Sequence, residues 1–112
     1  SNTILLDNRS PDEFSGLIAA GPRPGRIPNS INLPWDVLCG GTDYVYKNLD
    51  SMQKILDGKN ITPNKEIICY CQVGERSSHT FLGLKLLNYN KVKIYDHSYS
   101  EWSSIDSLPV EL

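Results

Sequence analysis

The 112-residue sequence lacks the features that mark membrane, secreted and nucleic-acid-binding proteins. No apolar run approaches the roughly 18 residues that a membrane span needs, and the start, SNTILLDNRS, lacks the basic and then apolar pattern of a signal peptide. Its 11 lysines and arginines form no cluster and are outnumbered by 13 aspartates and glutamates, which argues against a polyanionic partner. We therefore expect a soluble cytoplasmic protein without a membrane or nucleic-acid partner.

Cysteine is also scarce, because only Cys39, Cys69 and Cys71 occur. An odd number without the spacing of a disulfide scaffold predicts reduced thiols in a reducing compartment. Cys69, Cys71 and His79 do not match the spacing of a zinc site. We therefore expect no bound metal and no cofactor.

An initiator methionine is absent too, since the chain begins with Ser1 and Asn2. Its length, with 39% hydrophobic residues, fits one compact domain spanning residues 1–112. We hypothesise that this domain has been excised from a longer, two-domain polypeptide.

Short apolar runs alternate with helical patterns along the chain, which is typical of an α/β fold with a parallel sheet. A capping box at Ser10 and Glu13, with Pro11 at the first helical position, predicts a helix over residues 11–19. Asp50 or Ser51 is the expected cap of the helix at 49–58. The remaining predictions are a helix over 77–87 and strands at 3–7, 30–33, 66–71 and 92–96.

The stretch EIICYCQVGERSSHT, residues 66–80, places Cys71 between a strand and a glycine-bearing loop that leads into a helix. Cys71 is either an inert buried thiol or a nucleophile in a cradle of backbone amides. Gly74 lets such a loop curl, and free amides at a helix N-terminus bind anions. We expect Arg76 to add positive charge and Glu75 to point to solvent, because an inward carboxylate would oppose a thiolate.

Four motifs together resemble the rhodanese family of sulfurtransferases, in the order in which that family has them. They are LLDNRSPDEF (5–14), GRIPNSINLPW (25–35), CYCQVGERSS (69–78) and YDHSYSEW (95–102). The resemblance implies a mostly parallel central sheet of four to five strands with helices on both faces. Three positions depart from the family pattern. Arg26 stands where the family often has histidine, His97 where it usually has glycine, and Tyr99 where it usually has tryptophan. The role of His97 stays open.

The same resemblance implies a thiosulfate sulfurtransferase, most similar to the second domain of tandem enzymes. In this interpretation Cys71 becomes a persulfide and passes sulfur to cyanide or a thiol. The anion cradle consists of the backbone amides of Gln72, Val73, Gly74, Glu75, Arg76 and Ser77. Arg76 follows Cys71 after four residues, whereas related phosphatases have five, which favours sulfur over phosphate. The alternatives are a sulfur-relay carrier loaded by a cysteine desulfurase and a non-catalytic rhodanese-like binding module.

The other candidate residues have structural as well as functional interpretations. Asp7 and Arg9 form either an ion pair that orders the loops or a direct substrate contact. Cys69 is expected in the core rather than as a resolving thiol, and Cys39 in an exposed turn with no assigned role. His79 is expected to be hydrogen-bonded and structural. Trp35 and Trp102 are expected to pack, and lining the mouth of the pocket is a weaker alternative for Trp102.

Overall fold

The computed structural model describes residues 2–19, 21–40 and 45–112. The helices and strands follow one another as β1 (Thr3–Asp7), α1 (Pro11–Ser15), β2 (Ile31–Asn32), the 3₁₀ helix η1 (Trp35–Leu38), β3 (Cys39–Gly40), β4 (Val45–Tyr46), α2 (Leu49–Gly58), β5 (Glu66–Tyr70), α3 (Glu75–Leu86), β6 (Val92–Ile94) and α4 (Ser98–Trp102).

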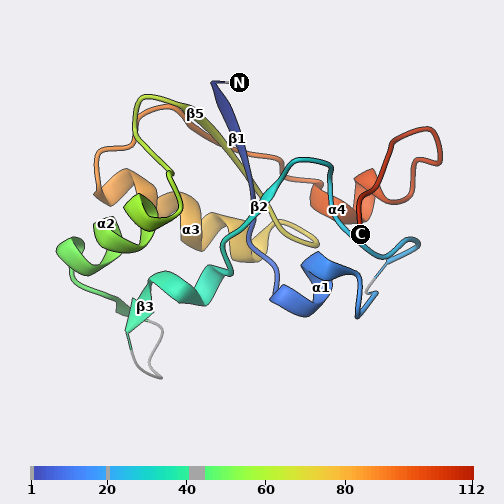
Figure 1. The fold of residues 1–112 in the computed structure, drawn as a ribbon, viewed down its shortest axis with the longest axis horizontal. Coiled ribbons are helices and arrows are strands. Elements are labelled where there is room, and N and C mark those ends of the chain that lie inside the picture. The colour runs from blue at the N-terminus through green and yellow to red at the C-terminus, as the bar shows by residue number, and fades with distance from the viewer. Residues whose placement is uncertain (1, 20, 41–44) are drawn as a thin grey trace.

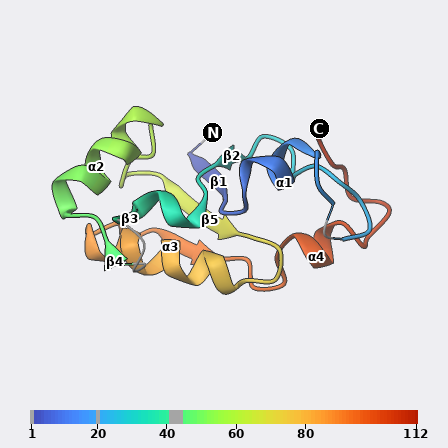
Figure 2. The ribbon, with the colours of Figure 1, turned by 90° about the horizontal axis from the view of Figure 1, so that it is seen from below.

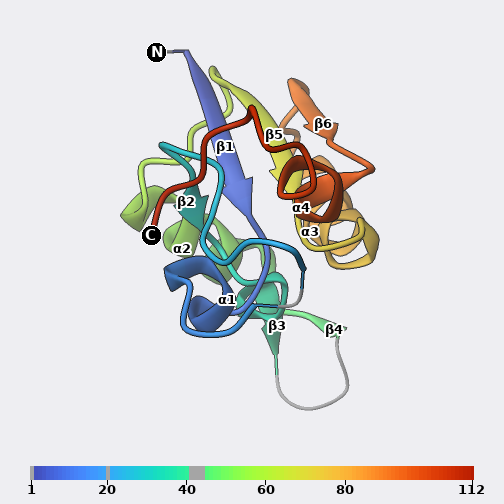
Figure 3. The same cartoon turned by 90° about the vertical axis from the view of Figure 1, so that its right-hand side faces the viewer.

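Four strands form one sheet in the order β2-β1-β5-β6, and every pairing in it is parallel. Figure 3 shows β1, β5 and β6 running side by side in the same direction. The short strands β3 and β4 pair separately as an antiparallel ribbon. The predicted α/β fold with a mainly parallel sheet is therefore confirmed.

Each face of the sheet carries its own apolar cluster, because successive side chains on a strand point to opposite faces. One cluster joins Ile4, Leu6 and Ile67 to Leu56 of α2 and Leu84 of α3. The opposite cluster contains Tyr70 with Leu5, and Tyr99 and Trp102 of α4 pack against it. Helices thus cover both faces, with α2 and α3 towards one end of the molecule and α1 and α4 towards the other (Figures 1 and 2).

Helix boundaries differ from the predictions where a single residue changes the backbone direction. Helix α1 ends at Ser15 rather than at residue 19, because Gly16 takes a left-handed conformation with φ of 88° and caps the helix. Helix α2 has the expected bounds, but its N-cap is Asn48, whose side chain accepts the Ser51 amide. Helix α3 begins at Glu75, two residues earlier than predicted, directly after Gly74.

Several short elements were not predicted, and one of them corrects the prediction for Cys39. Cys39 lies in strand β3 and is 7% exposed, so it does not lie in an exposed turn. A two-residue strand carries too little periodic pattern to be recognised from sequence. The elements η1, β4 and α4 were missed for the same reason, since none exceeds five residues.

No helix in the described ranges is long and apolar enough to cross a membrane.

Candidate active site

The carboxyl ends of β1 and β5 bring the candidate residues together. Asp7 ends β1 and pairs in register with Tyr70, the last residue of β5. The chain continues from β1 to β2 on one side, while β5 lies on the other, so the strand order reverses between β1 and β5. Open parallel sheets bind their ligands at such a switch point. The loop after β5 lies here, between α1 and α4 (Figures 1 and 2).

The loop after β5 curls round the sulfur of Cys71. The Gly74 amide donates to the Cys71 Sγ over 2.9 Å, and Gly74 has φ of 106°, which glycine adopts without strain. Burial by itself opposes ionisation of this thiol, which is 1% exposed. The hydroxyl and amide of Ser77 and the amides of Gly74 and Val73 outweigh that effect, so the pKa of Cys71 lies below its ordinary value. The site thus stabilises the thiolate relative to that of a free cysteine.

Other loop residues point away from the sulfur or support the loop from outside. Gln72 accepts the Arg9 Nη1 at 3.4 Å through its side chain and the Ser100 amide at 2.9 Å through its carbonyl. The Val73 side chain is 62% exposed, and Glu75 is exposed, as expected for a carboxylate that would oppose a thiolate. Val73 therefore contributes its amide rather than its side chain.

Arg76 is held by a carboxylate that the sequence did not suggest as its partner. Its Nη1 and Nη2 donate to Oε1 and Oε2 of Glu13 in α1, at 2.7 and 3.2 Å. The bond to Glu13 is the main reason why the pKa of Arg76 is raised, and the negative charge of Cys71 contributes as well. The guanidinium is thus close enough to interact with the thiolate, but its charge is shared with Glu13.

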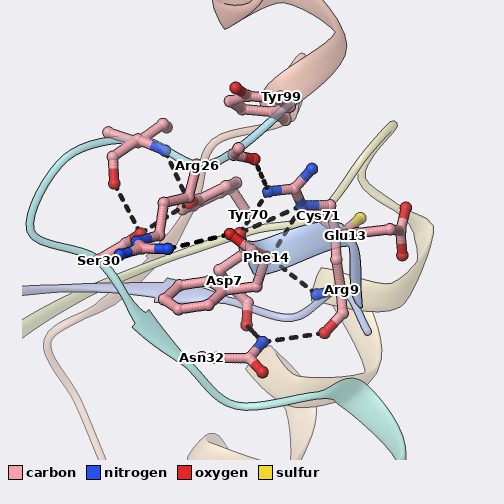
Figure 4. Close-up of polar contacts among 12 residues, drawn as sticks. Asp7, Arg9, Glu13, Phe14, Arg26, Ser30, Asn32, Tyr70, Cys71 and Tyr99 are labelled. Atoms are coloured by element: carbon pink, nitrogen blue, oxygen red, sulfur yellow. Dashed lines mark hydrogen bonds and ion pairs between the residues drawn. The ribbon is translucent and has the colours of Figure 1, made fainter. Parts of the chain in front are cut away.

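Asp7 and Arg9 form a buried ion pair beneath the loop (Figure 4). Arg9 donates to both carboxylate oxygens of Asp7, with the shortest distance 2.7 Å from Nη2 to Oδ2. Its Nη2 also donates to the Gly25 carbonyl at 2.7 Å, and its guanidinium stacks 4.2 Å from the centre of the Tyr99 ring. Both side chains are at most 2% exposed. Of the two interpretations, the geometry matches the ion pair that orders the loops.

Helix α4 clamps the loop through contacts that sequence reasoning missed. The Cys71 amide donates to the Ser98 Oγ at 3.1 Å, and the Tyr99 amide donates to the Cys71 carbonyl at 2.9 Å. Ser98 is fully buried and has φ of 52°, an unusual conformation for a residue other than glycine. His97 before it has φ of −74°, so the position does not require the glycine that the family usually has. The motif YDHSYSEW was the available signal for this contact.

The two other cysteines lie apart from this cradle. Cys69 is fully buried in the core, as expected, and burial together with the neighbouring Cys71 raises its pKa to about 12. The Cys39 Sγ lies 3.2 Å from Nε2 of His79. Burial lowers the pKa of His79, and the rings of Trp35 and Tyr46 flank it, which matches a structural histidine.

The two tryptophans pack in different places. Trp35 lines a cavity of about 270 Å³ together with Glu75, Arg76 and His79. Trp102 lines an apolar cavity of about 410 Å³ over β1, β5 and β6, away from the loop. Its Nε1 donates to the Pro109 carbonyl at 2.7 Å. Trp102 therefore packs against the sheet and does not line the mouth of the cysteine loop.

Within the described residues, no three histidine, cysteine, aspartate or glutamate side chains are grouped closely enough to hold a metal ion.

The lowered pKa of Cys71 predicts how its alkylation depends on pH. The iodoacetamide rate should rise with pH through a midpoint below the roughly 8.5 of free cysteine. Because the pKa is lower in the folded state, the thiolate stabilises the fold fully above the unfolded pKa, and this contribution is lost as pH falls through the folded pKa. Peptide mass mapping would assign the rate to Cys71, with Cys69 as the unreactive internal reference. A midpoint at 8.5 or above would refute the cradle.

Gly74→Ala should disrupt the loop, because a Cβ there would lie 2.8 Å from the Asp96 carbonyl oxygen and φ is strongly positive. A left-handed residue other than glycine costs roughly 1–2 kcal/mol, and the clash should add to that. We expect a lower melting temperature and slower alkylation of Cys71. Gly58→Ala is the matched control, since an added Cβ there meets no atom within 4 Å apart from its chain neighbours and the backbone of its own helix. Equal melting temperatures for both variants would contradict the prediction.

Comparison with known proteins gives a family assignment that agrees with this geometry. Residues 1–105 match the rhodanese-like domain. The chain is 42% identical over 117 residues to a Mycobacterium leprae protein named "Putative thiosulfate sulfurtransferase", covering 96% of this chain and 42% of the relative. It is 36% identical to the Thermus thermophilus sulfur carrier protein TtuD, covering 95% of this chain and 40% of that protein. The chain thus spans less than half the length of these relatives.

Solved structures show the same fold. An EanB variant with a cysteine persulfide and ergothioneine superposes with a TM-score of 0.90 at 24% identity, over 99% of this chain and 28% of that one. The anaerobic ergothioneine biosynthesis enzyme of Chlorobium limicola, with trimethyl histidine bound, has a TM-score of 0.80 at 26% identity, over 98% and 28% of the two chains. With a sequence match over almost its whole length and this fold, the chain belongs to the rhodanese-like domain family.

Proposed function

We propose that this domain transfers sulfane sulfur from thiosulfate to cyanide or a thiol through a persulfide on Cys71. The observation that carries the proposal is the cradle itself, in which the Gly74 amide donates to the Cys71 Sγ at 2.9 Å and the pKa of this thiol is lowered. The relatives named as thiosulfate sulfurtransferases support the same reaction class.

The proposed reaction has two steps. The Cys71 thiolate attacks the outer sulfur of thiosulfate, the sulfur–sulfur bond to the sulfonate breaks, and sulfite leaves with the electron pair. Cyanide or a thiolate then attacks the outer sulfur of the persulfide and regenerates the Cys71 thiolate. Loop amides stabilise the anion at each stage, and because sulfite is a good leaving group the steps need no general base.

Two features of the loop favour sulfur transfer over phosphate chemistry. Only four residues separate Cys71 from Arg76, and the guanidinium of Arg76 is engaged by both carboxylate oxygens of Glu13. A guanidinium held in this way is poorly placed to donate two hydrogen bonds to a tetrahedral phosphate. The loop suits the outer sulfur of a persulfide better.

Parallel assays of two activities test the proposal. We expect thiocyanate to form from thiosulfate and cyanide, and we expect no comparable hydrolysis of p-nitrophenyl phosphate. Both activities should be compared with those of Cys71→Ser. Efficient phosphate hydrolysis that depends on Cys71 would refute the assignment to sulfur chemistry.

A sulfur-relay carrier is the second candidate, because the chain is 36% identical to the sulfur carrier protein TtuD. In that role a cysteine desulfurase or another carrier loads Cys71, and a biosynthetic protein accepts the sulfur. Loading from a desulfurase persulfide that is much faster than loading from thiosulfate would favour the relay. A non-catalytic binding module is the third candidate, and the activated thiol argues against it.

The proposal extends to a further rhodanese-like domain in the full-length protein. The relatives are more than twice as long as the segment they share with this chain. The GERS ending of the loop and its continuation ERSSHT resemble the second half of tandem enzymes. The activity and donor selectivity of the isolated domain should therefore be compared with those of the full-length protein.

A further inference from the structure

Glu13 occupies an unusual position, because one carboxylate joins helix α1 to the cysteine loop. Its Oε1 accepts the Ser10 amide and hydroxyl at 3.1 Å each, and it accepts Arg76 Nη1 at 2.7 Å. Its Oε2 accepts Arg76 Nη2 at 3.2 Å. The Glu13 side chain is 12% exposed. Four hydrogen bonds thus hold this carboxylate in one orientation.

The Glu13 carboxylate is charged at neutral pH. Burial alone would favour its neutral form, but the bonds from Arg76 and Ser10 outweigh burial and lower the pKa of Glu13 to about 2. Arg76 in turn interacts electrostatically with the Cys71 thiolate as well as with Glu13. A single guanidinium therefore interacts both with a permanent carboxylate and with the reacting sulfur.

This arrangement leaves the mouth of the loop with little net positive charge. Glu13 offsets the charge of Arg76, the Asp7–Arg9 pair is internally balanced, and Glu75 on the same helix is an exposed carboxylate. Arg76 is 29% exposed and lines the cavity with Trp35, Glu75 and His79, so ligands can approach it from solvent. Anion binding is then left mainly to the uncharged loop amides.

We propose that Glu13 is a specificity-determining residue which, by neutralising Arg76, limits the preference of the site for highly charged anionic sulfur donors. The proposal deepens the sulfurtransferase function and rests on it only for the identity of the donor. A doubly charged donor such as thiosulfate gains less from Arg76 than it would without Glu13. Sulfite, also an anion, leaves more readily for the same reason. Glu13 acts through Arg76 and does not itself touch the reacting atoms.

Glu13→Gln removes the charge while keeping the shape and the acceptor oxygen for Ser10. The readout is the ratio of the Cys71 alkylation rates with iodoacetate and with iodoacetamide, because only iodoacetate is charged. For one unit charge acting across several ångströms at a protein surface, we expect this ratio to rise roughly three- to fivefold. The KM for thiosulfate should fall by a larger factor, because thiosulfate carries two negative charges and iodoacetate carries one. Unfolding would instead move the ratio towards that of a free cysteine, so the measurement requires a Glu13→Gln protein whose circular dichroism spectrum and melting curve are native.

The matched controls separate charge at the loop from charge elsewhere and from helix stability. Glu66→Gln also removes a carboxylate from an ion pair, with Lys93 at 3.0 Å, but it lies at the other end of β5. Ser10→Ala removes the capping hydroxyl of α1 and retains every charge. Both variants should have the ratio of the unmodified protein.

A charge cycle covers the case in which Glu13→Gln folds poorly. Arg76→Gln leaves Glu13 unopposed and should lower the ratio, whereas Glu13→Gln combined with Arg76→Gln should return it to within about twofold of the original value. An unchanged ratio in Glu13→Gln, or no recovery in the double variant, would overturn the role of Glu13. A raised ratio in a protein that does not turn over thiosulfate, either as this domain or at full length, would support charge control by Glu13 and refute thiosulfate as the donor.

Discussion

Cys71→Ser should abolish sulfur transfer, with a loss of roughly a thousandfold or more in turnover, because the reaction proceeds through a bond to the cysteine sulfur. Incubation with thiosulfate should add one sulfur, about 32 Da, to the unmodified protein, as expected for a covalent intermediate. Cyanide should remove that mass. Intact-protein mass spectrometry measures both changes, and the serine variant should show neither.

Cys69→Ala is the matched control for that experiment. It also removes a thiol from the end of β5, but its side chain lies in the core and its pKa is raised to about 12. The variant should keep the adduct. An adduct that persists in Cys71→Ser but disappears in Cys69→Ala would place the sulfur on Cys69 and refute the assignment of Cys71 as the nucleophile. No adduct on any of the proteins would direct the search to a desulfurase donor or to the full-length chain.

Arg9→Met should cause the largest loss of stability. It leaves the Asp7 carboxylate buried and without its ion-pair partner, which costs about 3–5 kcal/mol. A domain of this size has a free energy of unfolding of roughly 5–15 kcal/mol, so the variant should lie near the limit of folding. Urea denaturation followed by circular dichroism measures the difference.

Lys93→Met tests whether burial, rather than ion pairing as such, makes Arg9 important. Lys93 pairs with Glu66 at 3.0 Å, but the two side chains are 70% and 38% exposed. Exposed pairs contribute about 0–1 kcal/mol. Replacing Asp7 with leucine in the Arg9→Met background should recover part of the stability, because no unpaired charge then remains. Similar losses from Arg9→Met and Lys93→Met would contradict this account.

Where strong local patterns exist, sequence and structure agree closely. Apolar runs predicted strands at 3–7 and 66–71, and the structure has β1 at Thr3–Asp7 and β5 at Glu66–Tyr70. The capping box at Ser10 and Glu13 forms as expected. The placement of Cys71 in a turn before a helix also follows from its neighbours in sequence. These features depend on interactions within a few residues, which a single sequence contains.

Contacts between distant segments could not be predicted in the same way. Arg76 and Glu13 are 63 residues apart, and Ser98 reaches the Cys71 amide across 27 residues. Glu13 already had a local explanation as a capping residue, so nothing in the sequence pointed to a second partner. The burial of Cys39 was missed for the same reason. Cys39 is buried through contacts between β3 and α3, which form only on folding, so its neighbours in sequence indicated a turn.

The sequence by itself thus determined the α/β fold, the strand that leads to Cys71 and the glycine that lets the loop turn, because propensity, capping and periodicity act over short distances. Only the tertiary structure decided that Asp7 and Arg9 neutralise each other beneath the loop, that Glu13 shares the charge of Arg76, and that Ser98 holds the Cys71 backbone. The electrostatics of the site depend on distances between side chains from β1, α1, α3 and α4. Those distances arise only when the sheet brings the carboxyl ends of its parallel strands together.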